Sequence, residues 1–209
     1  MRILDQVDLR VNKGETVAIV GTSGAGKSTL LGLLAGLDEP SSGKVWLAGE
    51  ELTAMDEDGR AALRAERVGF VFQSFHLISS LTALENVMLP LELSGANSPQ
   101  ESALQAIDTV GLEPRKGHYP HQLSGGEKQR VAIARAFVVQ PDVLFADEPT
   151  GNLDQRTGEN IVELLFRMNR ESGTTLVLVT HDLDLASRCD RILFMEAGRI
   201  ERESGPAEA

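Results

Sequence analysis

A glycine-rich segment near the N-terminus is the feature that most constrains the fold of this chain. Residues 21–28 read Gly-Thr-Ser-Gly-Ala-Gly-Lys-Ser, between an apolar run at 17–20 and a helical pattern at 27–35. Glycines allow backbone conformations that point successive N–H groups inward, and a helix start adds partial positive charge. A turn without a ligand would need neither Lys27 nor the Ser28 hydroxyl. The pattern therefore predicts a phosphate cradle, with Lys27 at the terminal phosphates and Ser28 on Mg²⁺.

Composition limits the class of protein. The 209 residues are 42% hydrophobic and 24% charged, which is typical of a globular domain. Lys and Arg number 20 against 31 Asp and Glu, and the net charge of −11 disfavours nucleic acid as a partner. The single cysteine, Cys189, cannot form an internal disulfide and is expected to be a small buried residue in a reducing cytosol. The densest apolar stretch, 30–37, is far shorter than the ~20 residues of a membrane span.

Hydrophobic periodicity predicts an α/β fold with a mostly parallel sheet covered on both faces. The middle of the chain, 81–139, is predicted to be all-helical, with capping boxes at Thr82 and Ser98 and a third helix at 124–140. We therefore expect one domain, with a core formed by 1–80 and 140–209, an inserted helical subdomain, and a frayed end at 204–209. The predicted strands are 7–11, 17–20, 44–47, 68–72, 143–146, 175–179 and 192–195, and the other predicted helices are 27–35, 56–67 and 154–171.

An acidic pair follows the apolar run 143–146. Successive side chains of a strand point to opposite faces, so Asp147 and Glu148 are expected to have different roles. Asp147 suits the surroundings of Mg²⁺, which tends to keep its waters. Glu148 precedes Pro149, is biased toward an extended conformation, and is a candidate base for a water that attacks phosphate. The alternative for an isolated Asp-Glu pair is a capping or solvated role.

A second glycine pair opens the helix predicted after Leu123. Ser124 and Glu127 form the pattern of a capping box around Gly125 and Gly126. Two glycines in a first helical turn cost roughly 1 kcal/mol each relative to alanine, and a cap alone does not explain them. A hydroxyl, unshielded N–H groups and a helix dipole form an anion site. Because Glu127, and not a lysine, follows the second glycine here, this site is expected to complete the binding of a phosphate that is held elsewhere.

Together these residues resemble the nucleotide-binding subunit of ABC transporters, across nearly the whole chain. The resemblance comprises 21–29 as Walker A, Gln73 as Q-loop, 124–129 as signature, 147–148 as Walker B, 151–154 as D-loop and His181 as switch histidine. Residues 70–75, 81–87 and 148–154 look like the MacB/LolD/FtsE branch, and residues 65–70 and 141–145 look closest to the YbbA-type ATPases. The resemblance implies a P-loop NTPase (RecA-like) core with an antiparallel β part near the N-terminus.

The resemblance also implies the roles of the site residues. It implies a head-to-tail homodimer in which ATP lies between the Walker A of one subunit and Ser124, Gly125, Gly126 and Glu127 of the other. His181 would hold the γ-phosphate and orient Glu148, Gln73 would touch Mg²⁺ and the attacking water, and Asp154 would contact the partner subunit and cap a helix. The implied ligands of Mg²⁺ are Ser28, Gln73 and Asp147. The implied ATP-binding residues are Gly21, Thr22, Ser23, Gly24, Ala25, Gly26, Lys27, Ser28 and Thr29.

A separate permease is the further partner that the resemblance implies. The chain would hydrolyse ATP on the cytoplasmic face of a bacterial inner membrane and drive export or extraction of a lipophilic or envelope substrate. Exposed Phe75, Leu77 and Ile78 would form the docking site. The alternatives are a soluble ABC-type ATPase not involved in transport, and a kinase or GTPase, for which the chain lacks an Asn-Lys-x-Asp motif.

One departure from the family concerns adenine. Members usually stack an aromatic residue on the base upstream of the first strand, whereas residues 1–6 contain none. Either the start of the chain is truncated or adenine is held more loosely. His76, His118 and His121 lack metal-ligand spacing with any cysteine and are expected to be solvated or at an interface.

Overall fold

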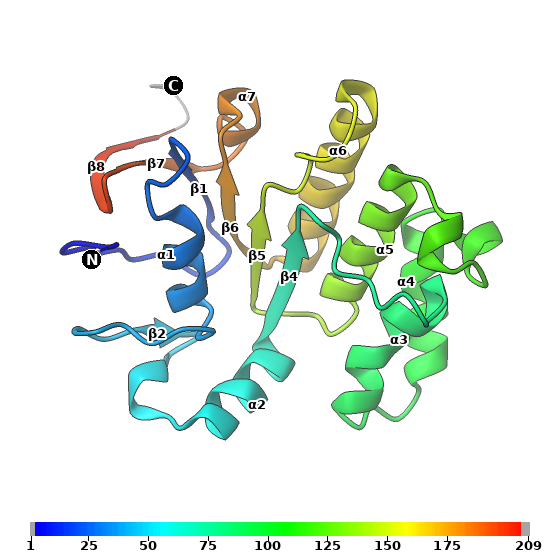
Figure 1. Cartoon of the computed structure of the whole chain (residues 1–209). Helices are drawn as coiled ribbons and strands as arrows, with labels where there is room; N and C mark the ends of the chain where they lie inside the picture. Colours follow the sequence, from blue (N-terminus) through cyan, green and yellow to red (C-terminus); the bar gives the residue numbers. More distant parts are fainter. Residues whose placement is uncertain (1–2, 206–209) are drawn as a thin grey trace.

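The computed structural model describes residues 3–205 and centres on a six-stranded sheet (Figure 1). The strand order is β4-β5-β6-β1-β7-β8, and all neighbours are parallel except the antiparallel pair β7–β8. A separate antiparallel hairpin joins β2 to β3. The strands are β1 (Thr16–Gly21), β2 (Trp46–Leu47), β3 (Glu50–Glu51), β4 (Val68–Phe72), β5 (Val143–Asp147), β6 (Thr175–Thr180), β7 (Arg191–Glu196) and β8 (Arg199–Ser204). The predicted α/β fold with a mostly parallel sheet is confirmed.

Helices cover both faces of the sheet because its strands are apolar on both sides. In β1, Val17 and Ile19 join a core cluster with α1, while Ala18 and Val20 join a second cluster with α5 and α6. The result is a three-layer α/β/α arrangement. The helices are α1 (Lys27–Leu34), α2 (Glu57–Arg67), α3 (Ala83–Leu93), α4 (Pro99–Thr109), α5 (Gly125–Phe137), α6 (Gln155–Ser172) and α7 (Leu183–Ala186).

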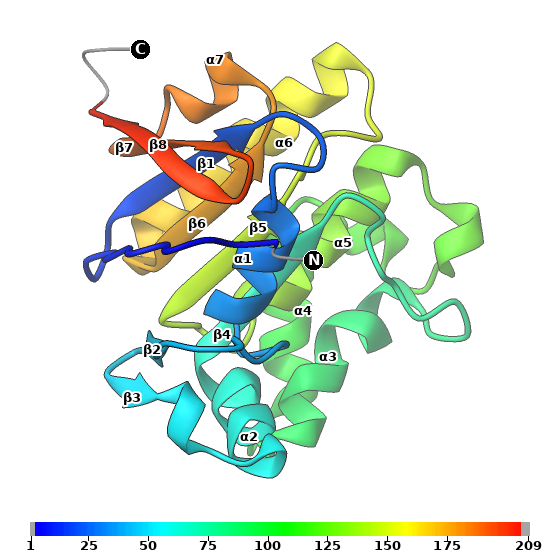
Figure 2. The ribbon, with the colours of Figure 1, turned by 60° about the vertical axis from the view of Figure 1, so that its left-hand side comes forward.

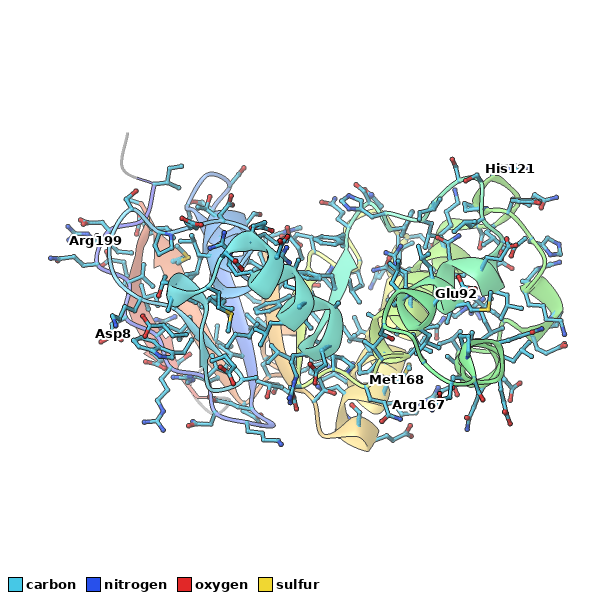
Figure 3. All side chains as sticks on the ribbon, turned by 90° about the horizontal axis from the view of Figure 1, so that it is seen from below. Asp8, Glu92, His121, Arg167, Met168 and Arg199 are labelled. Carbon is cyan, nitrogen blue, oxygen red and sulfur yellow. The ribbon has the colours of Figure 1, made fainter. Side chains whose placement is uncertain are left out.

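The segment between β4 and β5 contains α3, α4 and α5, with short 3₁₀ turns at Glu113–Arg115 and Pro120–Gln122. These helices pack on one another, and α5 also packs on β4. They lie at one end of the molecule, whereas β8 lies at the other (Figures 1 and 2). Seen from below, Glu92 and His121 mark the helical end, and Asp8 and Arg199 mark the opposite end (Figure 3).

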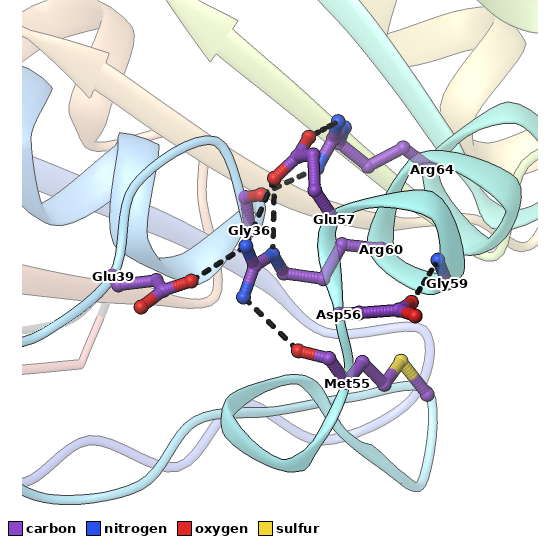
Figure 4. Close-up of polar contacts among 8 residues, drawn as sticks. All are labelled: Gly36, Glu39, Met55, Asp56, Glu57, Gly59, Arg60 and Arg64. Atoms are coloured by element: carbon purple, nitrogen blue, oxygen red, sulfur yellow. Dashed lines mark hydrogen bonds and ion pairs between the residues drawn. The ribbon is translucent and has the colours of Figure 1, made fainter.

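A polar cluster attaches α2 to the loop that follows α1 (Figure 4). Arg60 is buried and contacts Glu57 at 2.9 Å and Glu39 at 2.6 Å. Arg64 donates to the carbonyl oxygen of Gly36, just beyond the C-terminus of α1. Each guanidinium therefore connects α2 to the loop after α1, which fixes α2 near the C-terminus of that helix.

Two predictions of local structure were wrong. Residues 7–11 form no strand, although Val7, Leu9 and Val11 pack against a core cluster, because alternation reports a buried face and not a paired strand. The antiparallel part near the N-terminus is therefore only the hairpin β2–β3. Ser98 does not cap α4 with its side chain, since its backbone (φ −139°, ψ 61°) lies outside the usual N-cap region and Pro99 starts the helix.

The end of the chain also differs from the prediction. Strand β8 was not predicted, and its last residue, Ser204, is buried rather than frayed. A tight turn with positive φ at Ala197 and Gly198 connects it to β7. Residues 206–209 lie outside the described part of the chain. Among the helices of residues 3–205, none combines the length and apolar character needed to cross a bilayer.

Candidate functional site

The phosphate loop, residues 21–28, connects the end of β1 to the start of α1. Gly24 and Gly26 both have positive φ, 81° and 96°, a conformation that favours glycine. A Cβ on Gly26 would lie 2.9 Å from Cδ2 of Leu4, so the N-terminal segment also requires a glycine there. The loop therefore has the conformation that directs N–H groups toward an anion.

Lys27 and Ser28, the first two residues of α1, present the polar side chains of this loop. The Lys27 Nζ donates to the carbonyl oxygens of Gly21 at 2.8 Å and Thr22 at 3.0 Å, so its ammonium group lies over the loop. The Ser28 hydroxyl donates to Oδ2 of Asp147 at 3.3 Å. This contact joins the start of α1 to the end of β5 and brings together two of the predicted Mg²⁺ ligands.

The acidic pair lies at the carboxyl end of β5, and its two side chains have different partners. Burial raises the pKa of Asp147, and the charge of Glu148 acts in the same direction, while Ser28 and Lys27 oppose the shift. Glu148 has φ +46°, so the predicted extended conformation before Pro149 was wrong. Its N–H donates to Val179 and its carbonyl accepts from Gly151, and these bonds hold the backbone in a left-handed turn.

Glu148 contacts the end of β6 with both carboxylate oxygens. Nδ1 of His181 lies 2.8 Å from Oε1, and the hydroxyl of Thr180 donates to Oε2 at 3.4 Å. The carboxylate oxygen accepts a hydrogen bond in this contact in the tautomer of His181 that carries its proton on Nδ1. The Glu148 side chain is 18% exposed and that of His181 is 75% exposed. The imidazole therefore shields Glu148 while its own outer edge remains open to a ligand.

Gln73 follows β4 and contacts the loop after the acidic pair. Its Nε2 donates to Oδ1 of Asn152 at 3.3 Å, and Nδ2 of Asn152 donates back to the Gln73 carbonyl at 2.9 Å. The structure brings Gln73 to residues 151–152, whereas its side-chain hydrogen bond goes to neither Ser28 nor Asp147. Asn152 was not singled out from the sequence, and its position in the 151–154 motif was the available signal.

The signature segment, residues 124–129, forms the start of α5. Ser124 is the N-cap and forms a capping box with Glu127, whose pKa is lowered by the Ser124 backbone N–H and also by Arg115. A Cβ on Gly126 would lie 2.6 Å from Cγ2 of Thr157. Gly126 therefore has a packing reason that sequence reasoning missed, which is the close approach of α5 to the start of α6.

Asp154 ends the 151–154 loop and begins α6. Its Oδ1 accepts from the Thr157 N–H at 3.0 Å, which is the N-cap contact predicted for it. Hydrogen bonds from the side chain and then the backbone of Thr157 lower the pKa of Asp154. Thr157 therefore helps to fix both the start of α6 and the glycine pair of the signature segment.

The two anion sites lie far apart within one chain. The phosphate loop follows β1, whereas the signature segment begins the helix that packs on β4. Strands β6 and β5 separate β1 from β4, which is three strand spacings, or about 14 Å. The phosphate loop and the signature segment are thus attached to strands in different parts of the sheet.

The residues at the end of β5 fit Mg²⁺. A serine hydroxyl and a carboxylate are the hard oxygen donors that this ion prefers, and a cation would compensate the buried charge of Asp147. Residues 3–205 contain no cluster of three or more His, Cys, Asp or Glu side chains suited to a metal. Such a site would therefore depend on substrate phosphates for its remaining ligands.

The predicted docking residues are less exposed than expected. Ile78 is 41% exposed, but Phe75 and Leu77 are half-buried, and Leu77 packs against the larger core cluster. His76 is exposed and stacks on Phe72. Cys189 is buried as predicted, and burial raises the pKa of its thiol to about 12.

Comparison with known proteins identifies close relatives. A family model described as ABC transporter matches residues 4–151. The ABC transporter ATP-binding protein YbbA of Escherichia coli (strain K12) is 59% identical over 206 residues, covering 98% of this chain and 90% of the relative. The lipoprotein-releasing system ATP-binding protein LolD of Xanthomonas oryzae pv. oryzae (strain MAFF 311018) is 52% identical over 207 residues, covering 98% and 84%.

A solved structure has the same fold. The ATP-binding cassette MJ0796, in a dimeric post-hydrolysis state bound to ADP and Pi, superposes with a TM-score of 0.90 at 43% identity. The match covers 98% of this chain and 90% of that one. A dimer of two such cassettes is thus a known arrangement for a chain similar to this one.

Proposed function

Because this chain belongs to the ABC transporter family and is an ATP-binding, ATP-hydrolysing subunit, we propose that it powers a separate permease of the bacterial inner membrane. The chain lies on the cytoplasmic face and drives export or extraction of a lipophilic or envelope substrate. The name of the relative LolD, a lipoprotein-releasing system ATP-binding protein, supports that substrate class. We place the chain in one nucleotide-binding domain, with a core formed by 1–80 and 140–209 and a helical subdomain at 81–139.

ATP binds at residues 21–29 in this proposal. The backbone N–H groups of the loop surround the phosphates, and Lys27 turns from the loop carbonyls to the terminal phosphates. Ser28 and Asp147 would hold Mg²⁺, with Gln73 as a further ligand once its side chain leaves Asn152. When bound, the ion supplies positive charge that stabilises the phosphate oxygens.

Glu148 is the general base, and the observation that carries this assignment is its 2.8 Å contact with His181. The carboxylate accepts a proton from the attacking water, and His181 fixes its orientation. The exposed edge of the imidazole then faces outward to the γ-phosphate. The pairing of β6 with both β1 and β5 supports this role, because His181 directly follows β6 while the phosphate loop and the acidic pair lie at the carboxyl ends of the two neighbouring strands.

Two chains complete the site head-to-tail. Residues 124–127 of one chain contact the ATP held by the phosphate loop of the other, and Asp154 lies at the same interface. The three strand spacings between β1 and β4, about 14 Å, and the dimer formed by MJ0796 support this arrangement. The N–H groups at the start of α5 then supply the second set of donors for the same phosphates.

The permease docks on a groove beside β4, an edge strand of the sheet. The groove has a volume of about 280 Å³ and lies between the sheet and the inserted helices. In this proposal the docking surface also includes the exposed Ile78, in the segment between β4 and α3. Aromatic and apolar side chains form most of it, which suits a short apolar helix of a partner. The lining residues that carry the argument are Phe70, Phe72, Pro90, Arg135 and Ala136.

Recovery of partners from native membranes tests the proposal. A tagged chain should recover an integral-membrane permease from detergent extracts. Ile78→Asp should lower that recovery at least about fivefold, since it buries a charge in the contact. The matched control is Leu183→Asp, at an exposed leucine of α7, which should recover the permease normally. Recovery of nucleic acid in place of a permease would favour a soluble ABC-type ATPase not involved in transport.

A further inference from the structure

The turn after Gln73 is held in a conformation that its residues disfavour. Phe75 and His76 both have positive φ, 61° and 48°, although neither is a glycine. The His76 N–H donates to the Ser74 carbonyl at 2.6 Å, and its ring stacks on Phe72 at 4.6 Å. Two successive left-handed residues persist only where surrounding contacts compensate for the strain.

Arg135 supplies the main compensating contact. It lies in the last turn of α5 and donates from Nη1 to the carbonyl oxygen of His76 at 2.7 Å and from Nη2 to that of Phe75 at 3.0 Å. Both strained peptides are therefore held by one planar guanidinium. Burial lowers the pKa of Arg135, and within residues 3–205 it forms no ion pair. A half-buried cation whose partners are two carbonyl oxygens positions the backbone rather than balancing a charge.

Two further contacts fix the same segment. Asn86 of α3 is fully buried and accepts from the Ile78 N–H at 2.8 Å while it donates to the Ile78 carbonyl at 3.1 Å. The ring of Phe75 reaches the other end of α5, where a Cβ on Gly125 would lie 3.9 Å from its Cζ. Phe75 thus contacts the last turn of α5 through its carbonyl and the first turn through its ring.

We propose that Arg135 is a positioning residue that joins the Phe75–His76 turn to α5, so that the turn sets the position of the signature segment. In this arrangement the ring of Phe75 helps to hold Gly125 in place, together with Leu153. A displacement of the turn is transmitted to Ser124 along a single rigid helix. The inference rests on the proposed role of residues 124–127 and adds the residues that place them.

Steady-state kinetics of the isolated chain tests the proposal without the permease, whose groove Arg135 also lines. Arg135→Gln should lower kcat about tenfold and leave the KM for ATP within about twofold, because capture at the phosphate loop does not involve α5. Arg135→Lys retains the positive charge but cannot donate to both carbonyl oxygens as a planar guanidinium does. Its kcat should therefore lie between those of the wild type and Arg135→Gln. Phe75→Leu, which shortens the contact with Gly125, should also lower kcat and spare KM.

The matched control is Arg67→Gln. Arg67 pairs with Asp142 at 2.8 Å, away from the signature segment, so its loss should leave both constants unchanged. Thermal unfolding of every variant shows whether the fold is retained. Unchanged kcat in folded Arg135→Gln and Arg135→Lys overturns the proposal, and so does a KM that rises in step with the fall in kcat.

A second readout separates this inference from the proposed function. In the Glu148→Gln background, ATP-dependent dimers should form, and adding Arg135→Gln should raise the protein concentration for half-maximal dimer at saturating ATP about tenfold. Failure of Glu148→Gln itself to dimerise would count against the proposed head-to-tail site. Normal dimerisation of the double variant would count against Arg135 alone.

Discussion

The molecule has two helix starts rich in glycine, and they use glycine for different physical reasons. At the start of α1, Gly24 and Gly26 adopt positive φ, which shapes the loop so that its N–H groups converge. At the start of α5, Gly125 and Gly126 have ordinary helical φ, and a side chain on Gly126 would instead collide with Thr157. One pair creates a conformation and the other permits a close approach.

Because of that difference, we expect only one of the two helix starts to bind a phosphate within a single chain. The phosphate loop has Lys27 and converging N–H groups, so it can capture a phosphate within one chain. In the signature segment Glu127, and not a lysine, follows the second glycine, the segment has no left-handed residue, and the Ser124 hydroxyl already accepts a hydrogen bond within the capping box. Its geometry depends on α6 and on the loop before it. It is therefore expected to act only when another chain brings a phosphate to it.

The largest expected effect is a loss of ATP hydrolysis without a loss of ATP binding at the phosphate loop. Glu148→Gln should lower kcat by about 10²–10⁴-fold, the usual contribution of a positioned base, while ATP still binds. The variant should accumulate as a nucleotide-bound dimer. Phosphate release and size-exclusion chromatography with ATP measure the two effects. Glu159→Gln, on the exposed face of α6, is the control, and a wild-type rate for Glu148→Gln would disprove the base assignment.

A change at the signature side should leave capture intact and remove dimerisation. Ser124→Arg introduces a long cation at the proposed contact with the partner's ATP, and we expect turnover to fall about 10–100-fold. Nucleotide titration of the monomer should be unaltered. Ser98→Arg is a matched control, since Ser98 begins α4 without a side-chain cap. Weaker ATP binding by the Ser124→Arg monomer would contradict the division between the two sites.

The packing explanation for the signature glycines predicts a smaller effect, on stability. Gly126→Ala should destabilise the chain by about 1–3 kcal/mol, although alanine alone would favour the helix by roughly 1 kcal/mol. Thr157→Ser removes the colliding Cγ2 and keeps the hydroxyl, so it should restore most of the loss. Urea unfolding of the single and double variants measures the coupling. Gly117→Ala, where a Cβ would meet nothing within 4 Å, should change little.

The smallest expected effect is a pH dependence of opposite sign at the two sites. The pKa of Glu127 is lowered in the fold, so its contribution to the free energy of unfolding is present at neutral pH and is lost as pH falls through that pKa. The pKa of Asp147 is raised, mainly by burial, so its contribution is greatest when it is protonated and is lost as pH rises through that pKa. Urea midpoints of Glu127→Gln and Asp147→Asn between about pH 3 and 7 should therefore diverge from wild type in opposite directions. If the urea midpoints of both variants followed the wild-type pH dependence, this contrast would be wrong.

Sequence patterns predicted the sheet and the positions of most chemical groups, because buried strands and phosphate loops have local signals. They failed where a tertiary contact overrides the local preference. The turn at Glu148 depends on hydrogen bonds to Val179 and Gly151, which proximity to Pro149 does not reveal. The partner of Gln73, Asn152, lies 79 residues away in the chain.

The same limitation applies to the glycines and to Arg135. A Gly-Gly pair in a first helical turn signals something unusual, but only the neighbouring helix shows that the cause is Thr157. Arg135 reads as an ordinary residue of an amphipathic helix, and its two partners are backbone carbonyls that carry no sequence signal. Groups that act through backbone atoms are for this reason the least accessible to sequence reasoning.

The burial of Cys189 has a practical consequence for following the motion of this chain. It is the only cysteine in the sequence, and a thiol with a pKa of about 12 holds almost no reactive thiolate at neutral pH. The wild-type chain is therefore not expected to react with maleimides. A cysteine introduced at the exposed position 78 would be the one residue to take a fluorophore, and its emission would report when a partner covers that position.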